Sequence, residues 1–168
     1  MKTITISWLC IEAITFITLL GIASVSAGVT SDTGWTLTLS GDHASSVTQG
    51  EYEKGINVEQ SSNYFASVVD ATGQVWDGMP LWRLVSRVND AGSQDYSVTV
   101  TGTGGETVTL PGSDIAGNDA FILANTKNGV PLGQSDPSYP LVLAGKGLPI
   151  DEMIPGVSSI TLKLSDSH

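Results

Sequence analysis

The sequence predicts an α+β fold that is mainly β, with one clear helix and short turns. Two patterns support this prediction. Segments such as Trp35–Ser40 and Tyr96–Thr101 alternate large residues with hydroxylated ones, which is the period-two pattern of half-buried strands. Met79–Asn89, in contrast, carries apolar residues at helical spacing. We therefore expect a strand-rich domain against which one helix packs.

The N-terminal part of the domain is predicted to contain short elements. The strand at Trp35–Ser40 is followed by a loop over Gly41–Val47 and a short polar helix over Thr48–Lys54. Gly55 ends that helix, because glycine readily takes the left-handed conformation that follows a helical C-terminus. From Ile56 to Val75 the chain is rich in β-branched and aromatic residues. We expect two or three short strands there.

The helix over Met79–Asn89 is the clearest in the sequence. Pro80 suits the first turn, where its missing N–H is not needed. The residues at positions i, i+3, i+4 and i+7 form one apolar face: Leu81, Leu84, Val85 and Val88. Arg83 and Arg87 lie four residues apart on another face. That face is either solvated, with the aliphatic stems covering the core, or an anion site.

Strand patterns return after the helix. Tyr96–Thr101 and Glu106–Leu110 both alternate, and Gly102–Gly105 between them indicates a hairpin turn. The remaining elements expected are a brief turn at Ser113–Ile115, a turn at Lys127–Pro131, and strands at Ala120–Ala124, Pro140–Ala144 and Val157–Leu164.

The composition excludes several classes of function. Charged residues make up 14% of the 168 residues, and 17 acidic against 7 basic residues give a net charge of -10. Such a chain lacks the basic surface that nucleic acids and anionic membranes require. Cys10 is the single cysteine, and His43 and His168 are the two histidines. We expect no catalytic residue and no metal ligand.

The N-terminal segment Met1–Ala27 is typical of an export signal. Lys2 precedes a long apolar run, and the small residues Val25-Ser26-Ala27 suit cleavage after Ala27. Residues 28–168 would then form a single secreted domain without cysteine. Because the apolar run approaches the roughly 20 residues of a membrane span, an uncleaved N-terminal anchor is the alternative.

Two arrangements resemble catalytic motifs but are better explained structurally. Gly102–Gly105 is followed by a strand, whereas a dinucleotide-binding loop is followed by a helix. Serine catalysis needs a histidine base, yet His43 lies in a polar loop and His168 is the last residue. The aromatic residues pack in the core or line a pocket or carbohydrate platform: Trp35, Tyr64, Trp76, Trp82 and Tyr96.

The segment Trp76–Val85 resembles the strand-Gly-x-Pro-Leu-helix element of the oxidoreductase molybdopterin-binding domain family, which has the sulfite-oxidase-like fold. Four later segments are similar to elements of that family in the same order: the hairpin Tyr96–Leu110, the strand Ala120–Ala124 with Asn128–Leu132 after it, Tyr139–Leu143 and Val157–Leu164. The resemblance implies a sulfite-oxidase-type molybdopterin-binding fold for nearly all of the domain.

The sequence also departs from that family. The resemblance implies a molybdenum-binding cysteine upstream of the Trp-x-Gly element, but Ile56–Val75 contains none. Val142 stands where many members have arginine, and Tyr139 where they have glycine. The chain is therefore similar to a short version of the family that lacks the metal-ligating cysteine. We expect no cofactor, and molybdopterin is implied by the resemblance alone.

The leading interpretation is a secreted, non-catalytic, molybdopterin-binding-like domain that acts as a small-ligand-binding or cell-surface module. Its partner would be a small organic ligand or a cell-surface protein. One alternative is an active molybdopterin-dependent oxidoreductase without a cysteine metal ligand. Another is a purely structural extracellular interaction domain.

A ligand cleft, if kept, is expected near Ser61–Val69 and the Trp76–Gly78 turn. Tyr64, Trp76 and Asp77 are its candidate ligand-binding residues, because such pockets combine apolar burial with a few orienting polar groups. The competing outcome is that Tyr64, Phe65 and Trp76 pack together and fill the cleft.

Overall fold

The computed structural model describes residues 34–55, 65–90 and 95–165, all within the compact unit Asp32–His168. The described chain is mainly β, as the sequence predicts, and its described helices are all short. In these residues no helix is both long enough and apolar enough to cross a membrane. Met1–Ala27 lies outside the described residues, so cleavage or anchoring of that segment stays a prediction.

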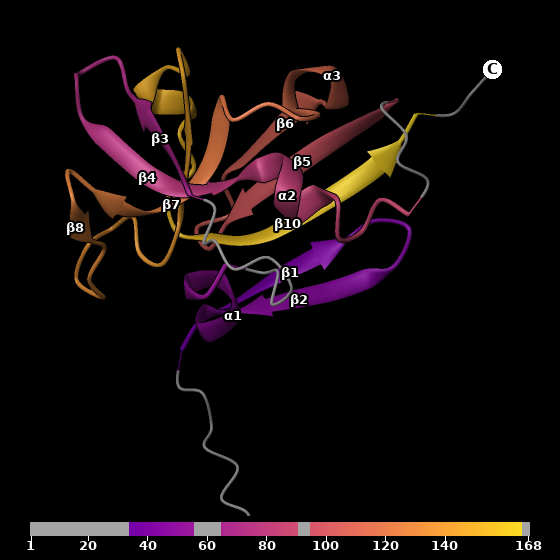
Figure 1. The fold of residues 1–168 in the computed structure, drawn as a ribbon, viewed down its shortest axis with the longest axis horizontal. Helices are drawn as coiled ribbons and strands as arrows, with labels where there is room; N and C mark the ends of the chain where they lie inside the picture. Colours follow the sequence, from indigo (N-terminus) through magenta and orange to yellow (C-terminus); the bar gives the residue numbers. More distant parts are fainter. Residues whose placement is uncertain (1–33, 56–64, 91–94, 166–168) are drawn as a thin grey trace, which may run out of the picture. The chain divides into compact units, whose positions relative to one another are not determined.

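The first sheet has five strands in the order β2-β1-β10-β5-β6. Its strands are β1 (Thr36–Ser40), β2 (Ala44–Thr48), β5 (Tyr96–Gly102), β6 (Thr107–Pro111) and β10 (Val157–Leu164). β10 pairs parallel with β1 and antiparallel with β5. Figure 1 shows β10, in yellow, between the first hairpin and the β5–β6 hairpin. β10 thus joins two hairpins into one sheet.

The second sheet is antiparallel throughout, with the order β3-β4-β7-β8 and with β9 also paired to β7. Its strands are β3 (Ala66–Val69), β4 (Val75–Pro80), β7 (Phe121–Lys127), β8 (Val130–Pro131) and β9 (Val142–Gly145). β9 pairs with the first part of β7, and β8 with its last two residues. The segment from β8 to β9 therefore leaves and rejoins the same strand.

The two sheets differ in how they are buried. Along β5 burial alternates, because one face of the first sheet packs on the core and the other is more exposed. In β7, Leu123 belongs to the main core cluster, whereas Ile122 and Ala124 belong to a second cluster. Successive strand residues point to opposite faces, so the second sheet is buried on both. This explains why β7 and β9 begin as continuous apolar runs.

The short helix predicted over Thr48–Lys54 is confirmed as α1 (Gln49–Glu53). Thr48 caps it: its hydroxyl accepts the Glu51 N–H, and the Glu51 carboxylate accepts the Thr48 N–H. Gly55 follows with φ of +68°, the left-handed conformation expected after the helix. The other helices are α2 (Leu81–Val85), α3 (Gly112–Ile115) and the 3-10 helix Ile150–Glu152.

The helix predicted over Met79–Asn89 is too long at both ends. Met79 and Pro80 belong to β4, where they pair with Leu123 and Ile122 of β7. After Val85 the backbone hydrogen bonds are those of turns: the Val88 N–H donates to the Val85 C=O, three residues earlier. The apolar face is confirmed, since Leu81, Leu84, Val85 and Val88 are at most 1% exposed. Arg87 therefore lies beyond the helix, in the turn that follows.

The loop predicted over Gly41–Val47 is also wrong in part. Ala44–Thr48 forms β2, an edge strand paired antiparallel with β1. Val47 is its one fully buried residue, so the side chains carry too little apolar signal to show a strand. Backbone pairing with β1 fixes it instead.

The remaining predicted strands are close to those observed. β10 has the predicted bounds Val157–Leu164, and the β5–β6 hairpin turns at the predicted glycines. The two or three strands expected between Ile56 and Val75 correspond to β3 and the first residue of β4 in the described part; residues 56–64 lie outside it.

Candidate ligand-binding site

Tyr52 fixes α1 against the second sheet. Its buried hydroxyl accepts the Met79 N–H at 2.9 Å and donates to the Leu123 carbonyl. The rings of Trp35 and Phe65 meet the Tyr52 ring edge-on, with centroids 5.3 and 5.7 Å away. Burial strongly raises the pKa of Tyr52, so the hydroxyl stays protonated and able to donate. These contacts hold α1 in one position.

A cleft of about 480 Å³ lies between α1 and the segment that links β8 to β9. We call it the α1 cleft. Its lining residues are Gly34, Gln49, Gly50, Glu53, Leu132, Gly133, Gln134 and Tyr139. Gln49, Gly50 and Glu53 come from α1, and the last four come from the β8–β9 segment. The cleft is thus built from parts of the chain that are about 80 residues apart.

The wall formed by the β8–β9 segment is held by its own backbone. Leu132 N–H donates to Asn125 C=O at 2.8 Å, and the buried Leu132 side chain packs in the second cluster. Asp136 N–H donates to Gly133 C=O, and Asp136 C=O accepts the Tyr139 N–H. The Asp136 carboxylate also accepts the Ser138 N–H at 2.8 Å. Hydrogen bonds of Asp136 and Gly133 thus stabilise this loop internally, and Tyr139 lies at its end.

The α1 cleft offers hydrogen-bonding groups rather than reactive ones. Gln49 and Gln134 carry amides that both donate and accept, and Tyr139 carries a phenol. Glu53 is the one charged residue in the described lining, and its carboxylate accepts the Gln49 amide N–H at 2.7 Å. A Cβ added at Gly133 would meet nothing within 4 Å, so the backbone there borders open space.

A second cleft of about 430 Å³ runs beside β3. We call it the β3 cleft. It is lined by Ser67, Val68, Val69, Asn118, Asp119, Ala120 and Lys146. Asp119 accepts the indole N–H of Trp82 at 2.9 Å, so one of its carboxylate oxygens already serves the fold. This cleft borders the part of the Ser61–Val69 stretch that the structure describes.

Of the three candidate ligand-binding residues, Trp76 and Asp77 line neither of the two clefts. Tyr64 lies outside the described residues. Trp76 is 4% exposed in the second cluster. Asp77 is half-buried and accepts the Ser67 hydroxyl. Their assignment to ligand binding stays a prediction. Phe65 packs on Tyr52, in the main cluster, so it and Trp76 do not form one aromatic plug.

Trp76 instead organises the β3–β4 turn with Asp70. Asp70 accepts the Trp76 indole N–H at 2.9 Å, and it also accepts hydrogen bonds from Thr72 and the Gln74 N–H. Burial acts to raise the pKa of Asp70, but these hydrogen bonds to the charged form outweigh it and lower the pKa to about 2. The carboxylate is a structural group of the turn.

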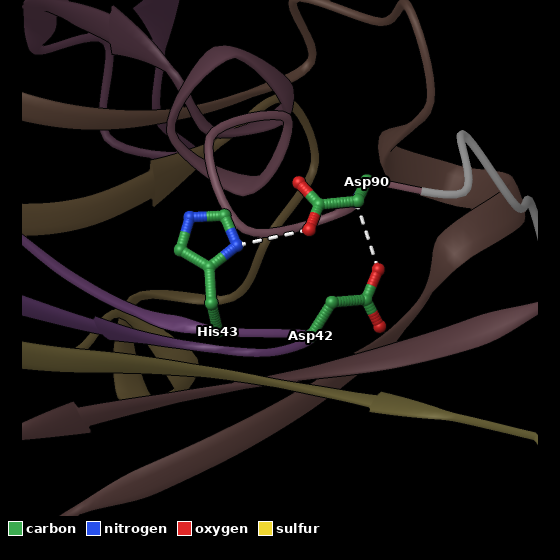
Figure 2. Close-up of polar contacts among 3 residues, drawn as sticks. All are labelled: Asp42, His43 and Asp90. Carbon is green, nitrogen blue, oxygen red and sulfur yellow. Dashed lines mark hydrogen bonds and ion pairs between the residues drawn. The ribbon is translucent and has the colours of Figure 1, made fainter.

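Hydrogen bonds among Asp42, His43 and Asp90 link the β1–β2 turn to the residues after α2 (Figure 2). His43 Nδ1 lies 3.1 Å from Asp90 Oδ2, and the Asp90 N–H donates to the Asp42 carboxylate at 2.8 Å. The His43 and Asp90 side chains are 47% and 69% exposed. No serine, threonine or cysteine of the described chain bonds to this histidine. The described residues also contain no cluster suited to a metal ion. These three residues connect two loops.

No protein family described by a sequence model matches the chain, and no curated protein does. Among solved structures, the chain is similar to the sulfane dehydrogenase SoxCD from Paracoccus pantotrophus, with a TM-score of 0.56 and 16% identity. The likeness covers 82% of this chain and 40% of that chain, so the chain spans less than half of that protein. At this identity the likeness supports the fold, and the expected sulfite-oxidase-type fold is confirmed.

The residues of the α1 cleft do not fit the molybdopterin that the resemblance implies. That cofactor carries a phosphate, and a protein thiolate is the expected ligand of its metal. The charged side chain of the α1 cleft is the carboxylate of Glu53, which repels phosphate. Neither cleft has a thiol in its described lining, because Cys10 is the sole cysteine of the sequence. We derive no chemical step through this cofactor.

Proposed function

We propose that the chain is a secreted, non-catalytic binding module of the sulfite-oxidase-type fold that takes up a small organic ligand in the α1 cleft. The observation that carries the proposal is the cleft itself, with about 480 Å³ bounded by two amides, a phenol and exposed backbone. Ligand sites usually measure roughly 300–1,000 Å³ and orient their ligand through a few polar groups. The α1 cleft has this size and these groups.

The chemistry of the lining favours binding over catalysis. The described lining contains Glu53 as its one carboxylate, and no serine, cysteine, histidine or lysine. Acid–base hydrolysis of a glycoside needs two carboxylates, and covalent catalysis needs a nucleophile with a base. Glu53 already accepts a hydrogen bond from Gln49. The described lining therefore favours holding a ligand, since it has neither two carboxylates nor a serine, cysteine or lysine nucleophile with a histidine base.

Secretion is supported by the sequence. Lys2, the apolar run and Val25-Ser26-Ala27 form the pattern of an export signal, and the domain that follows is free of cysteine. N-terminal sequencing of the mature protein is expected to begin near Gly28. Recovery of the chain with Met1 still present would support an anchor instead.

Ligand-observed NMR on the purified protein with a mixed fragment library tests the binding proposal. Fragments are expected to receive saturation from the wild type and to lose that signal in Gly133→Trp, which adds a large side chain at the wall of the α1 cleft. Signal that is equal in both proteins would place binding elsewhere, and no signal from any fragment would support a structural interaction domain. Either result contradicts the proposal.

An active molybdopterin-dependent oxidoreductase is the second candidate, and the likeness to a sulfane dehydrogenase favours it. Metal analysis and pterin fluorescence of protein purified from its native host separate the two. Molybdenum well below one per chain is expected. A value near one per chain, with pterin, would contradict the non-catalytic proposal.

A further inference from the structure

The hydrogen-bonding side chains around the α1 cleft suit one chemical class of ligand. Sugar hydroxyls each donate and accept a hydrogen bond, so they pair best with side chains that do both. Gln49 and Gln134 line the same cleft: the Gln134 amide has two donors and an acceptor, whereas Gln49 donates one amide hydrogen to Glu53 and keeps its second N–H and its carbonyl. Tyr139, half-buried and packed against the second cluster, also lines the cleft with a hydroxyl and an aromatic ring, and such rings suit the apolar C–H face of a sugar.

The glycines of the cleft leave room for a flat, hydroxyl-rich molecule. Gly34, Gly50 and Gly133 together make up three of its eight lining residues. Glycine lacks a Cβ, so a ligand can approach the backbone closely. At Gly133 the space where a side chain would stand is open. A ligand can therefore approach the backbone closely at Gly133.

The negative charge of the cleft restricts the chemical class of the ligand further. Glu53 gives the described lining a negative charge with no lysine or arginine to balance it, and the whole chain carries -10. Phosphorylated, sulfated and carboxylated ligands are repelled by such a site. The Glu53 carboxylate accepts a hydrogen bond from Gln49 at 2.7 Å, and its remaining lone pairs can accept hydrogen bonds from ligand hydroxyls. A neutral, hydroxyl-rich ligand can donate hydrogen bonds to the Glu53 carboxylate without charge repulsion.

We infer that the α1 cleft binds a short neutral saccharide, free or at the end of a glycan chain. This inference rests on the proposed binding function of the same cleft and names its ligand class. Neither saccharide hydrolysis nor transfer is implied, because Glu53 has no second carboxylate beside it in the described lining.

An array of neutral, sulfated, phosphorylated and sialylated glycans, probed with the labelled full protein, tests the inference. The expected result is binding to neutral glycans and at least tenfold weaker binding by Gly133→Trp, measured by titration calorimetry on the best glycan. Ser135→Trp adds the same bulk to an exposed residue of the same loop that does not line the cleft, and it should bind like the wild type. Circular dichroism confirms that both variants fold.

Three results would overturn the inference: no neutral glycan bound, anionic glycans preferred, or binding unchanged in Gly133→Trp. Glu53→Gln provides a second test, because it keeps the size and acceptor of Glu53 and removes the charge. Glu53→Gln should weaken neutral-glycan binding, because an amide oxygen accepts fewer hydrogen bonds than a carboxylate, but it should not abolish binding. If the wild type binds only amino-bearing glycans and Glu53→Gln binds none, the ligand is cationic and the inference is contradicted.

The failure of this inference is distinguishable from failure of the binding function. If fragments lose their saturation signal in Gly133→Trp but no glycan of the array is bound, the proposed binding function stands and the saccharide is excluded as its ligand. Soluble oligosaccharides and insoluble cellulose or chitin, tested in parallel, distinguish binding of a free saccharide from binding of a glycan chain. Binding in either form supports the ligand class, and binding in neither overturns it.

Discussion

The hydroxyl of Tyr52 donates to the carbonyl oxygen of Leu123, which lies 71 residues further along the chain. The same hydroxyl accepts the N–H of Met79, the strand partner of Leu123. A side chain from α1 thus takes part in the pairing of β4 with β7. The pairing shifts register just before, between Asp77 and Gly78. The position of α1, and with it one wall of the α1 cleft, depends on this contact.

Removing that hydroxyl should destabilise the fold. In Tyr52→Phe the Met79 N–H and the Leu123 carbonyl lose a buried partner, which costs about 1–3 kcal/mol of unfolding free energy. Urea unfolding measures the loss. Tyr96→Phe is the matched control, because the 6% exposed Tyr96 has no hydroxyl partner among the described residues. Equal losses in the two variants would show that the Tyr52 bridge contributes nothing.

Gly78 should tolerate no side chain. A Cβ there would lie 2.0 Å from the Leu123 oxygen and 2.4 Å from the Ala124 Cα, so β4 and β7 would have to separate. Overpacking of this kind costs about 1–3 kcal/mol. We expect a loss of at least that size in Gly78→Ala by urea unfolding, and almost none in Gly133→Ala, where the space is open. A Gly78→Ala variant as stable as the wild type would contradict the close approach.

Asp70 should make stability depend on pH in the acid range. Its folded pKa of about 2 lies below its ordinary value of 3.8. The stabilisation is therefore complete above about pH 5 and is lost as the pH falls toward 2. Asp70→Asn should cost about 1–2 kcal/mol at pH 7, because an amide cannot accept from both Trp76 and the turn. The gap between variant and wild type should shrink by pH 2.5.

The control for that experiment is Asp151→Asn, at an exposed position of the 3-10 helix. Its stability should follow the wild type at both pH values. A cost of Asp70→Asn that is constant from pH 7 to pH 2.5 would mean that the charge of Asp70 does not matter.

Leu84 should be among the most costly core truncations. It is fully buried on α2, in the cluster that joins both sheets. Leu84→Ala is expected to cost about 2–5 kcal/mol in denaturant unfolding. Val69→Ala, at a site that is 53% exposed, should cost far less. A loss for Leu84→Ala below about 0.5 kcal/mol would place the helix in a different register.

The sequence predicts elements whose signal is local. β10 alternates strongly enough to be predicted with its correct bounds, and Gly55 marks the end of α1. The end of β4 could not be predicted, because Met79 and Pro80 are strand residues only through Leu123 and Ile122. Their apolar spacing fits a helix equally well. Edge pairing with β1 likewise creates β2 from a polar segment.

The cleft was harder to predict than the fold. Gln49 and Gln134 are 85 residues apart in the sequence, and no motif connects them. Tyr139 stood out only because it replaces a glycine of the resembling family. Trp76, a natural candidate for ligand binding, packs at 4% exposure. Its aromatic character alone could not show whether it faces a ligand or the core.

Binding in the α1 cleft can be located by protein-observed NMR of the 15N-labelled protein, titrated with its best-binding neutral glycan. We expect saturable shifts of the backbone amides of Gly34, Gln49, Gly133 and Gln134, with those of Ser67, Asn118 and Lys146 in the β3 cleft unchanged. Shifts confined to the β3 cleft, or no saturable shift in the α1 cleft, would contradict binding in the α1 cleft.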